Sequence, residues 1–466
     1  MSAILDKPVT ANAAGLAQQF GALVAALDYD DLPPEAVHWA KVGILDTAGV
    51  TVAGAREPCA ALLTQALMPA PGPSALFGLP GRLRALDAAM INGTASHALD
   101  FDDCNNTLGG HPSAPVLPAL FALADEGGVD GKKFVAAYVA GFELETKIAM
   151  SVNFHHYMKG WHPTATLGVF GAAAACARLL DLDAARTAVA IALAASSAAG
   201  IKANFGTMTK PFHIGRCASE GLLAAKMAQA GYTANAARVF EHEQGFFEVY
   251  NGAGNYDALR GINAWASPLD IVRPGIAIKQ YPCCGSTHPA VDVAIDLARA
   301  HAFREEDIAE VEIWIHQRRL KHTNRPDPNS ELDAKFSVQY VVARALLDGS
   351  VTLAHFEDEA YMDARVRRLL PRVKAAPYGD VQFAPDNHFG GEVRVHLNDG
   401  RVVSGKTEQP AGRTSDNPLT AERLREKFAH CAAPALGEAK ISAAYDAIQN
   451  IENLDDMRTL SALLSL

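Results

Sequence analysis

The sequence predicts a mainly α protein: a large all-helical domain built from both chain ends, with a smaller α+β domain inserted between them. Three observations predict it. Apolar residues recur every three to four positions from about residue 10 to 265, and this spacing returns near the C-terminus. Between these regions the spacing changes to alternation. A chain of 466 residues also exceeds what one hydrophobic core usually spans. We therefore place the large domain at residues 1–267 and 406–466, and the small domain at 268–405.

Helical segments of the first region carry start signals such as prolines near the first turn. Several are rich in Ala and Gly on all sides, which allows close packing and predicts positions at the centre of the domain. The predicted helices cover residues 33–54, 85–100, 132–152, 168–182, 185–200 and 219–232.

The inserted domain mixes alternating and helical segments. Residues 391–397 and 401–406 alternate and are joined by Asn-Asp-Gly, a strong hairpin signal. The other predicted strands are 270–282 and 309–317, and the predicted helices are 287–302, 337–349 and 359–370. Residues 417–432 and 441–466 are predicted to be helical again and to pack on the first domain.

Composition excludes several classes of protein. The chain is 49% hydrophobic and 20% charged with a formal charge of -11, which is typical of a soluble globular protein and not of a nucleic-acid binder. Two short basic runs, 317–322 and 365–372, are interpreted as solvated faces. The seven cysteines form no CxxC or zinc-ribbon spacing, so we expect reduced thiols in a cytoplasmic protein. No stretch predicts a signal peptide or a membrane span.

Residues 97–115, "HALDFDDCNNTLGGHPSAP", gather three carboxylates and two histidines in a polar segment after a predicted helix. Asp100, Asp102 and Asp103 could simply cap the following turn, and His111 could be an ordinary residue before proline. Functional side chains, however, concentrate on such loops because their polar atoms can face a cavity. This segment is therefore one candidate wall of a functional site.

Three further proline-containing segments are interpreted as polar loops between apolar helices. Residues 159–164 carry His162, residues 207–216 carry Lys210 and His213, and residues 278–290 carry Lys279 and His288. Lys and His cations bind carboxylates, and a neutral His or desolvated Lys can move a proton. Motifs for serine hydrolysis, zincin chemistry, phosphoryl transfer and dinucleotide binding are absent from the sequence. His and Asp ligands could still converge from distant segments, but we predict no metal.

In this order, the four segments resemble the MmgE/PrpD family, together with residues 336–349 and the closing "PAGRTSDNPLTAERLREKF". The resemblance covers nearly the whole chain. It implies a large helical domain, a small α+β lid domain, a homodimer and an active site in the cleft between domains. It also implies cofactor-independent proton transfer beside a carboxylate of a small polycarboxylic acid, with neither nucleic acid nor a membrane as partner.

The resemblance also assigns residues by motif. The catalytic candidates are Asp100, His111, His162, Lys210 and Tyr340. The substrate-binding candidates are Lys279, His288, His213, Cys104 and Asn105.

Family members catalyse dehydration, decarboxylation or epimerisation, and the branch is predicted from departures in two motifs. Cys104, Asn105 and Asn106 follow the aspartates where dehydratase- and decarboxylase-like members have Thr and an aromatic residue, and Cys284 stands where a decarboxylase-like pattern has His. These departures favour an epimerase, an isomerase of iminodisuccinate-like acids. The alternatives are a 2-methylcitrate-type dehydratase, a cis-aconitate-type decarboxylase and a non-catalytic carboxylate-binding protein.

Overall fold

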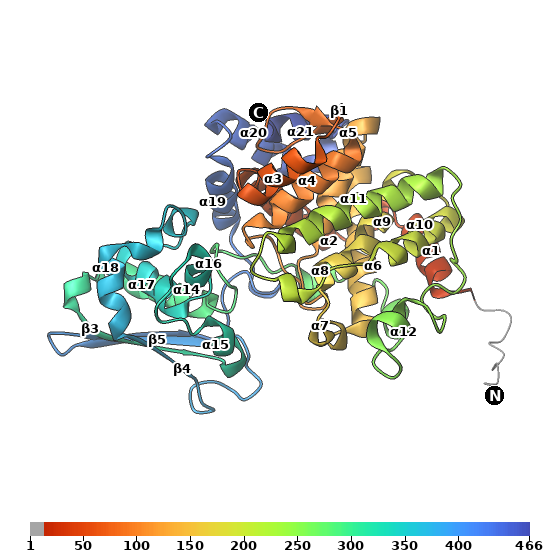
Figure 1. Ribbon diagram of the computed structural model, residues 1–466. Helices are drawn as coiled ribbons and strands as arrows, with labels where there is room; N and C mark the ends of the chain where they lie inside the picture. Colours follow the sequence, from red (N-terminus) through yellow and green to blue (C-terminus); the bar gives the residue numbers. More distant parts are fainter. Residues whose placement is uncertain (1–13) are drawn as a thin grey trace. The chain divides into compact units, whose positions relative to one another are not determined.

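The structure is a computed structural model that describes residues 14–466, so the start of the predicted helical pattern at residues 10–13 lies outside it. The chain forms two compact units (Figure 1). Unit 1 comprises the described residues up to Ala98, with 103–275 and 428–466, and unit 2 comprises 99–102 and 276–427. The predicted fold class is confirmed, because helices dominate and the strands form only small sheets.

Unit 1 is a helical domain with one short hairpin, β1 (Pro71–Ala75) and β2 (Arg82–Leu83). Helix α4 packs along α11, and α9 packs against α5, α6 and α11. Its helices are α1 (Leu16–Ala26), α2 (Pro34–Gly54), α3 (Pro58–Leu67), α4 (Ala85–Ala98), α5 (Ser113–Gly127), α6 (Gly131–Val152), α7 (His155–Lys159), α8 (Pro163–Thr166), α9 (Gly168–Leu179), α10 (Ala184–Ser197), α11 (Thr209–Gln229), α12 (Phe246–Asn251), α13 (Arg260–Asn263), α20 (Glu438–Gln449) and α21 (Arg458–Leu464).

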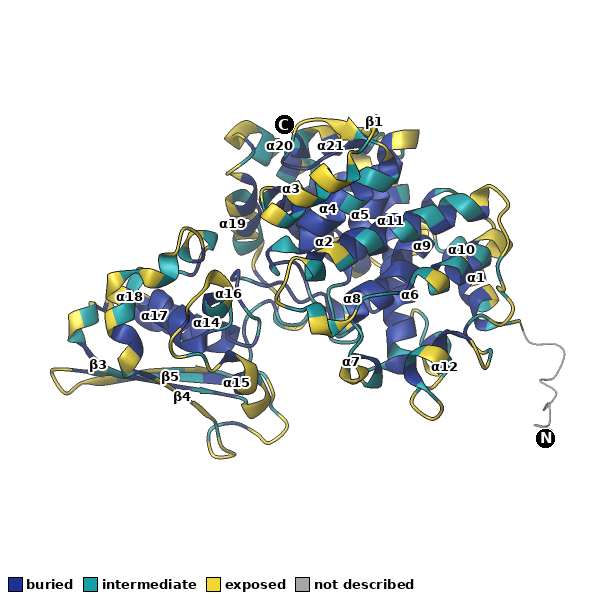
Figure 2. Ribbon diagram, in the orientation of Figure 1, coloured by how far each residue is buried: buried dark blue, intermediate teal, exposed yellow. Residues whose placement is uncertain are grey.

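Helices α6 and α9 lie at the centre of unit 1, and almost all of their residues are buried (Figure 2). Small residues allow this close packing. A Cβ atom at Gly141 of α6 would lie 2.5 Å from the carbonyl oxygen of Gly171 on α9. The Ala- and Gly-rich composition of these helices is therefore the local cause of their central position.

Unit 2 contains a four-stranded sheet in the order β4-β3-β5-β6. Strands β3 and β4 are parallel, and the other pairs are antiparallel. The strands are β3 (Ile308–Ile315), β4 (Val373–Pro377), β5 (Gly391–Leu397) and β6 (Val402–Thr407). The helices are α14 (His288–His301), α15 (Gln317–Thr323), α16 (Glu331–Lys335), α17 (Val338–Asp348) and α18 (Ala364–Leu369), and α19 (Ala421–Ala432) begins in unit 2 and ends in unit 1. Helix α14 packs on β5, β6 and α17, which buries the alternate residues of β5.

Two secondary-structure predictions are wrong, and proline explains both. Residues 270–282 form no strand: Ile271–Gly275 is a kinked turn in which Arg273 is extended, and Pro274 in it cannot donate a hydrogen bond to a sheet. Residues 207–216 are not a loop, because α11 begins at Thr209 and contains Pro211 in its first turn. Proline is tolerated there because the first-turn N–H groups have no intrahelical partner.

The unit boundaries also differ from the expected domain boundaries. The main part of unit 2 runs from Ile276 to Lys427, so its last segment, 406–427, was assigned to the other domain from the sequence. Ile278 N–H donates to the carbonyl oxygen of Gly412 at 2.8 Å, which ties this segment to unit 2. In residues 14–466, no helix combines the length and the apolarity that crossing a bilayer requires.

Candidate active site

Residues 97–111 run from the last turn of α4 to the start of α5, and their ends are fixed by hydrogen bonds. Asp103 caps α5, because its carboxylate accepts from the N–H and the hydroxyl of Ser113. Asn105 and Gly110 form an antiparallel bridge that closes the loop. A Cβ atom at Gly110 would lie 2.6 Å from Thr164 Oγ1, so only glycine allows this approach. The segment is thus a firmly held loop.

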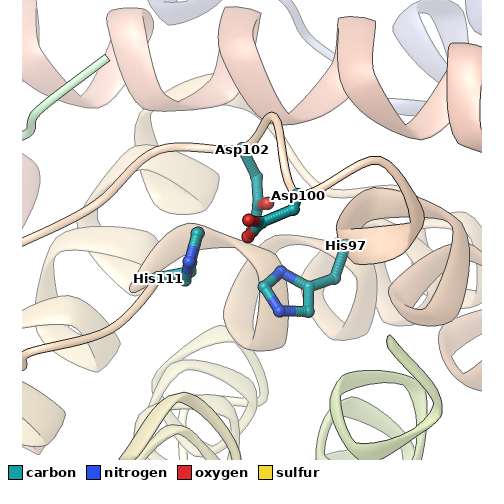
Figure 3. A group of neighbouring side chains, drawn as sticks. All are labelled: His97, Asp100, Asp102 and His111. Atoms are coloured by element: carbon teal, nitrogen blue, oxygen red, sulfur yellow. The ribbon is translucent and has the colours of Figure 1, made fainter. Parts of the chain in front are cut away.

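His97, Asp100, Asp102 and His111 place one ligand-type atom each within 4.8 Å of one another (Figure 3). Figure 3 shows the two carboxylates and the two imidazoles directed toward a common point. Asp100 reaches it with a φ angle of 52°, a left-handed conformation that Asp tolerates better than most residues. Imidazole and carboxylate groups in this arrangement could hold a divalent transition metal. They are equally the groups that exchange protons near neutral pH.

Lys279 provides the positive charge beside Asp100. Its Nζ lies 3.2 Å from Asp100 Oδ1 and donates to the Asp100 carbonyl oxygen at 2.5 Å. Lys427, which the sequence did not single out, donates to the carbonyl oxygen of neighbouring Phe101 at 2.8 Å and lies over its ring. Two lysines of unit 2 therefore hold residues 100–101, and Lys279 balances the Asp100 charge.

A second group of titratable side chains surrounds His162 in unit 1. His162 Nδ1 lies 3.2 Å from His213 Nδ1, and its ring lies 5.7 Å from that of His97, which contacts His111 at 4.5 Å. One of the two close Nδ1 atoms must donate and the other accept, so the two rings carry opposite tautomers. Burial holds the pKa of His162 well below its usual value, reinforced by the positive field of neighbours that include Lys210. His162 is therefore neutral at pH 7 and can accept a proton.

Cys104 lies beside His111, with Sγ 3.8 Å from Nδ1. The N–H of His111 donates to Thr164 Oγ1 at 3.1 Å, which fixes this part of the loop against α8. The structure thus brings together five candidates of unit 1: Cys104, His111, His162, Lys210 and His213.

The remaining candidates have their polar atoms engaged by the protein. Asn105 is buried; its amide donates to Asp270 and Gly275, and its oxygen accepts from Leu108. Tyr340 is fully buried in the core of unit 2, where its hydroxyl donates to the His355 carbonyl oxygen. This geometry favours structural roles for both, in contrast to the substrate-binding and catalytic roles expected from the sequence.

His288 is also held internally. Its Nε2 lies 3.3 Å from the Cys283 carbonyl oxygen, so the N–H must be on Nε2. Burial, together with the positive charge of Lys279, lowers the pKa of His288 to about 3. It is a neutral residue that supports the 283–288 turn, whereas the sequence pattern indicated a cation for substrate carboxylates.

Glu145 is a buried carboxyl group next to this region, on α6. Both of its oxygens are enclosed, and neither has a hydrogen-bond partner among the described residues. They lie close to α9, where a Cβ atom at Gly171 would come within 2.5 Å of Oε2. Burial, with the negative fields of Asp103 and Asp270, raises the pKa of Glu145 well above its ordinary 4.5. The folded protein therefore holds this group protonated.

The substitution Glu145→Gln is expected to reduce the loss of stability as pH rises. The folded state keeps a proton that the unfolded chain releases above about pH 4.5, so wild-type stability falls with rising pH. Between pH 5 and pH 8 the free energy of unfolding of the variant should improve relative to wild type by about 1–3 kcal/mol. Urea unfolding at both pH values measures this, with the exposed Glu357→Gln as control; a constant difference between E145Q and wild type would contradict it.

Sequence reasoning missed His97 and Lys427 of these groups, and also Arg319 and His322 of α15, which contact Ser286 of the 283–288 turn. His97 lies in the 97–115 segment, but it was not chosen as a candidate because it belongs to the predicted helix, where it is one of the buried residues of α4. His322 Nε2 lies 3.0 Å from Ser286 Oγ and 3.7 Å from Cys284 Sγ, so it joins the 283–288 turn from α15. His322 follows Arg319 by three residues, so a helix places both on one face. This spacing is the signal by which the sequence could have indicated that the two residues act on the same side of α15.

Comparison with known proteins identifies the family. The family model of the MmgE/PrpD N-terminal domain matches residues 18–258, and that of the C-terminal domain matches residues 281–453. The chain belongs to the MmgE/PrpD family. Cis-aconitate decarboxylase of Homo sapiens is 31% identical over 96% of this chain and 94% of its own length. The Mus musculus enzyme of that name is 29% identical over 96% and 93%, respectively. 2-Methylcitrate dehydratase of Salmonella typhimurium is 25% identical over 86% and 87%.

These MmgE/PrpD relatives correct one prediction from the sequence. Decarboxylases and dehydratases are lyases, and the similar proteins carry these names rather than those of isomerases. The prediction of an isomerase that epimerises iminodisuccinate-like acids is therefore wrong. Cys104 and Cys284 therefore do not indicate the epimerase branch.

Proposed function

We propose that the protein is a lyase that decarboxylates an unsaturated tricarboxylic acid of the cis-aconitate type. One observation carries the proposal: Asp100, which forms an ion pair with Lys279, lies in the same short segment as His97 and His111 and is grouped with them in space. An ammonium group, two imidazoles and a carboxylate are the groups needed to bind carboxylates and move one proton. Similarity to cis-aconitate decarboxylases along almost the whole chain supports this choice.

The reaction requires one bond cleavage and one proton. The bond between carbon and the departing carboxylate breaks, carbon dioxide leaves, and the electron pair spreads into the remaining unsaturated carboxylate. Lys279 stabilises the negative charge on that carboxylate, and Asp100 orients Lys279. His111 delivers a proton to carbon, and solvent returns a proton to the partly exposed His111, whose ring lies next to that of His97. A trianion and a proton thus give a dianion and carbon dioxide.

The second candidate is dehydration of a 2-methylcitrate-type hydroxy acid, favoured by the similarity to 2-methylcitrate dehydratases. In that reaction the neutral His162 would remove a proton beside a carboxylate, and a neighbouring acid would protonate the leaving hydroxyl. The two reactions share the carboxylate-binding groups and differ in which bond breaks.

The test uses the purified protein with cis-aconitate and, separately, 2-methylcitrate in heavy water, followed by NMR and by carbon dioxide detection. We expect carbon dioxide from cis-aconitate and one deuterium on carbon in the product. Loss of water from 2-methylcitrate without carbon dioxide release would replace the decarboxylase proposal by the dehydratase. No reaction with either acid would overturn both.

A further inference from the structure

Two arginines of unit 2 lie over one aromatic ring. The guanidinium carbons of Arg319 and Arg413 lie 4.6 and 4.7 Å from the centroid of the Phe389 ring. Arg319 comes from α15, and Arg413 comes from the segment that follows β6. Stacking on the ring holds the plane of each guanidinium group. Two positive charges are thus gathered in one place.

The hydrogen bonds of Arg319 are all to neutral groups. Its Nε donates to the His388 carbonyl oxygen at 2.5 Å, and its Nη1 donates weakly to Ser286 Oγ at 3.5 Å. Within residues 14–466, Arg319 forms no ion pair with a carboxylate. Burial, together with the positive charge of Arg413, lowers the pKa of Arg319 to about 10. A half-buried guanidinium beside another one is costly, and an anionic ligand would remove that cost.

The 283–288 turn brings Arg319 close to Lys279. Cys284 has both Lys279 and Arg319 as electrostatic neighbours, and Ser286 follows two residues later. Gly285 between them has no side chain, and a Cβ atom there would lie 3.9 Å from Lys279 Cε. Lys279 and Arg319, which lies on α15, therefore both lie beside the 283–288 turn of unit 2, and Arg319 contacts Ser286 of that turn.

We infer that Arg319 and Ser286 bind one carboxylate of the substrate, next to the carboxylate that Lys279 binds. Arg413 adds positive charge through the shared Phe389 ring. Arginine suits this role because its planar fork can donate two parallel hydrogen bonds to one carboxylate. The inference rests on the proposed function, since it names Arg319 as a residue that selects acids with several carboxylates.

Binding of a saturated tricarboxylate tests the inference without turnover. Tricarballylate, propane-1,2,3-tricarboxylate, has neither the double bond nor the hydroxyl group that the two proposed reactions need. Calorimetry should show binding to wild type, a dissociation constant about 10- to 100-fold higher for Arg319→Gln, and partial recovery for Arg319→Lys. The matched control is Arg318→Gln, the exposed neighbour on the same helix, which should change the constant less than twofold.

The outcomes separate the inference from the proposed function. If R319Q binds tricarballylate within twofold of wild type, the inference is overturned. It is also overturned if wild type does not bind tricarballylate at about 10 mM ligand. If R319Q does not fold, Ser286→Ala should weaken binding about 3- to 10-fold, and an unchanged constant would overturn it equally. A protein that binds tricarballylate through Arg319 but releases no carbon dioxide from cis-aconitate would retain the carboxylate position and lose the decarboxylase reaction.

Discussion

Replacing Lys279 with Met is expected to lower kcat/KM for the tricarboxylic acid substrate by about 100- to 1000-fold, which is the usual cost of removing one group that stabilises developing charge. Methionine keeps the length and most of the apolar stem of lysine but removes the ammonium group that contacts Asp100. The variant should remain folded, because Lys279 lies in an irregular segment before α14 and not inside a helix or strand. Steady-state kinetics and thermal unfolding of the same preparation measure the two effects separately.

A double-mutant cycle sharpens this prediction. Asp100→Asn alone should also lower kcat/KM, because Lys279 loses the carboxylate that orients it. The double variant D100N/K279M should be little worse than K279M alone, since the role of Asp100 acts through Lys279. Lys321→Met, an exposed lysine on α15, is the control and should change kcat/KM less than twofold. Strictly additive losses would show that Asp100 acts independently of Lys279.

The helices and the hairpin were predictable because their signals are local. The predicted helix 132–152 corresponds to α6, and Asn-Asp-Gly at 398–400 joins β5 and β6 as expected. Strand β4 was missed because its five residues, "VKAAP", show no apolar alternation. Its place is set by parallel pairing with β3, which lies about sixty residues earlier in the chain and leaves no local pattern.

The sequence indicated candidate site residues where a histidine stands next to a proline in a polar segment. His111 and His162 precede prolines, and their segments carry few competing apolar signals. Arg319 was interpreted as part of a solvated basic run, because one sequence cannot show which side of α15 faces the 283–288 turn. Asn105 was predicted to bind substrate, and its amide donates to Asp270, which lies 165 residues away in the chain and could not be found from a local pattern.

The anchor of that loop is a buried ionic network, and breaking it should have a large effect on stability. Lys147 Nζ lies 3.2 Å from Glu143 Oε1 and 3.7 Å from Asp270 Oδ1, and all three side chains are almost completely buried. Asp270 in turn accepts from Asn105 and Thr107 of the 97–111 segment. Lys147 therefore compensates the carboxylates on which the position of the loop depends.

Lys147→Met is expected to lower the free energy of unfolding by about 3–5 kcal/mol at pH 8, because it leaves two carboxyl groups buried without a cation. Burial already raises the pKa of Glu143 and of Asp270, and removing Lys147 removes a charge that opposes this rise. The folded variant can then bind protons that the unfolded chain has released, so its stability must fall as pH rises and recover toward pH 5. Glu143→Gln in the K147M background should restore part of the loss at pH 8, since it removes one of the two uncompensated charges.

Lys132→Met, exposed on the same helix α6, is the control for denaturant unfolding at both pH values. A loss in K147M that is equal at pH 5 and pH 8, and unaffected by E143Q, would assign the effect to packing of the lysine stem instead of to charge compensation.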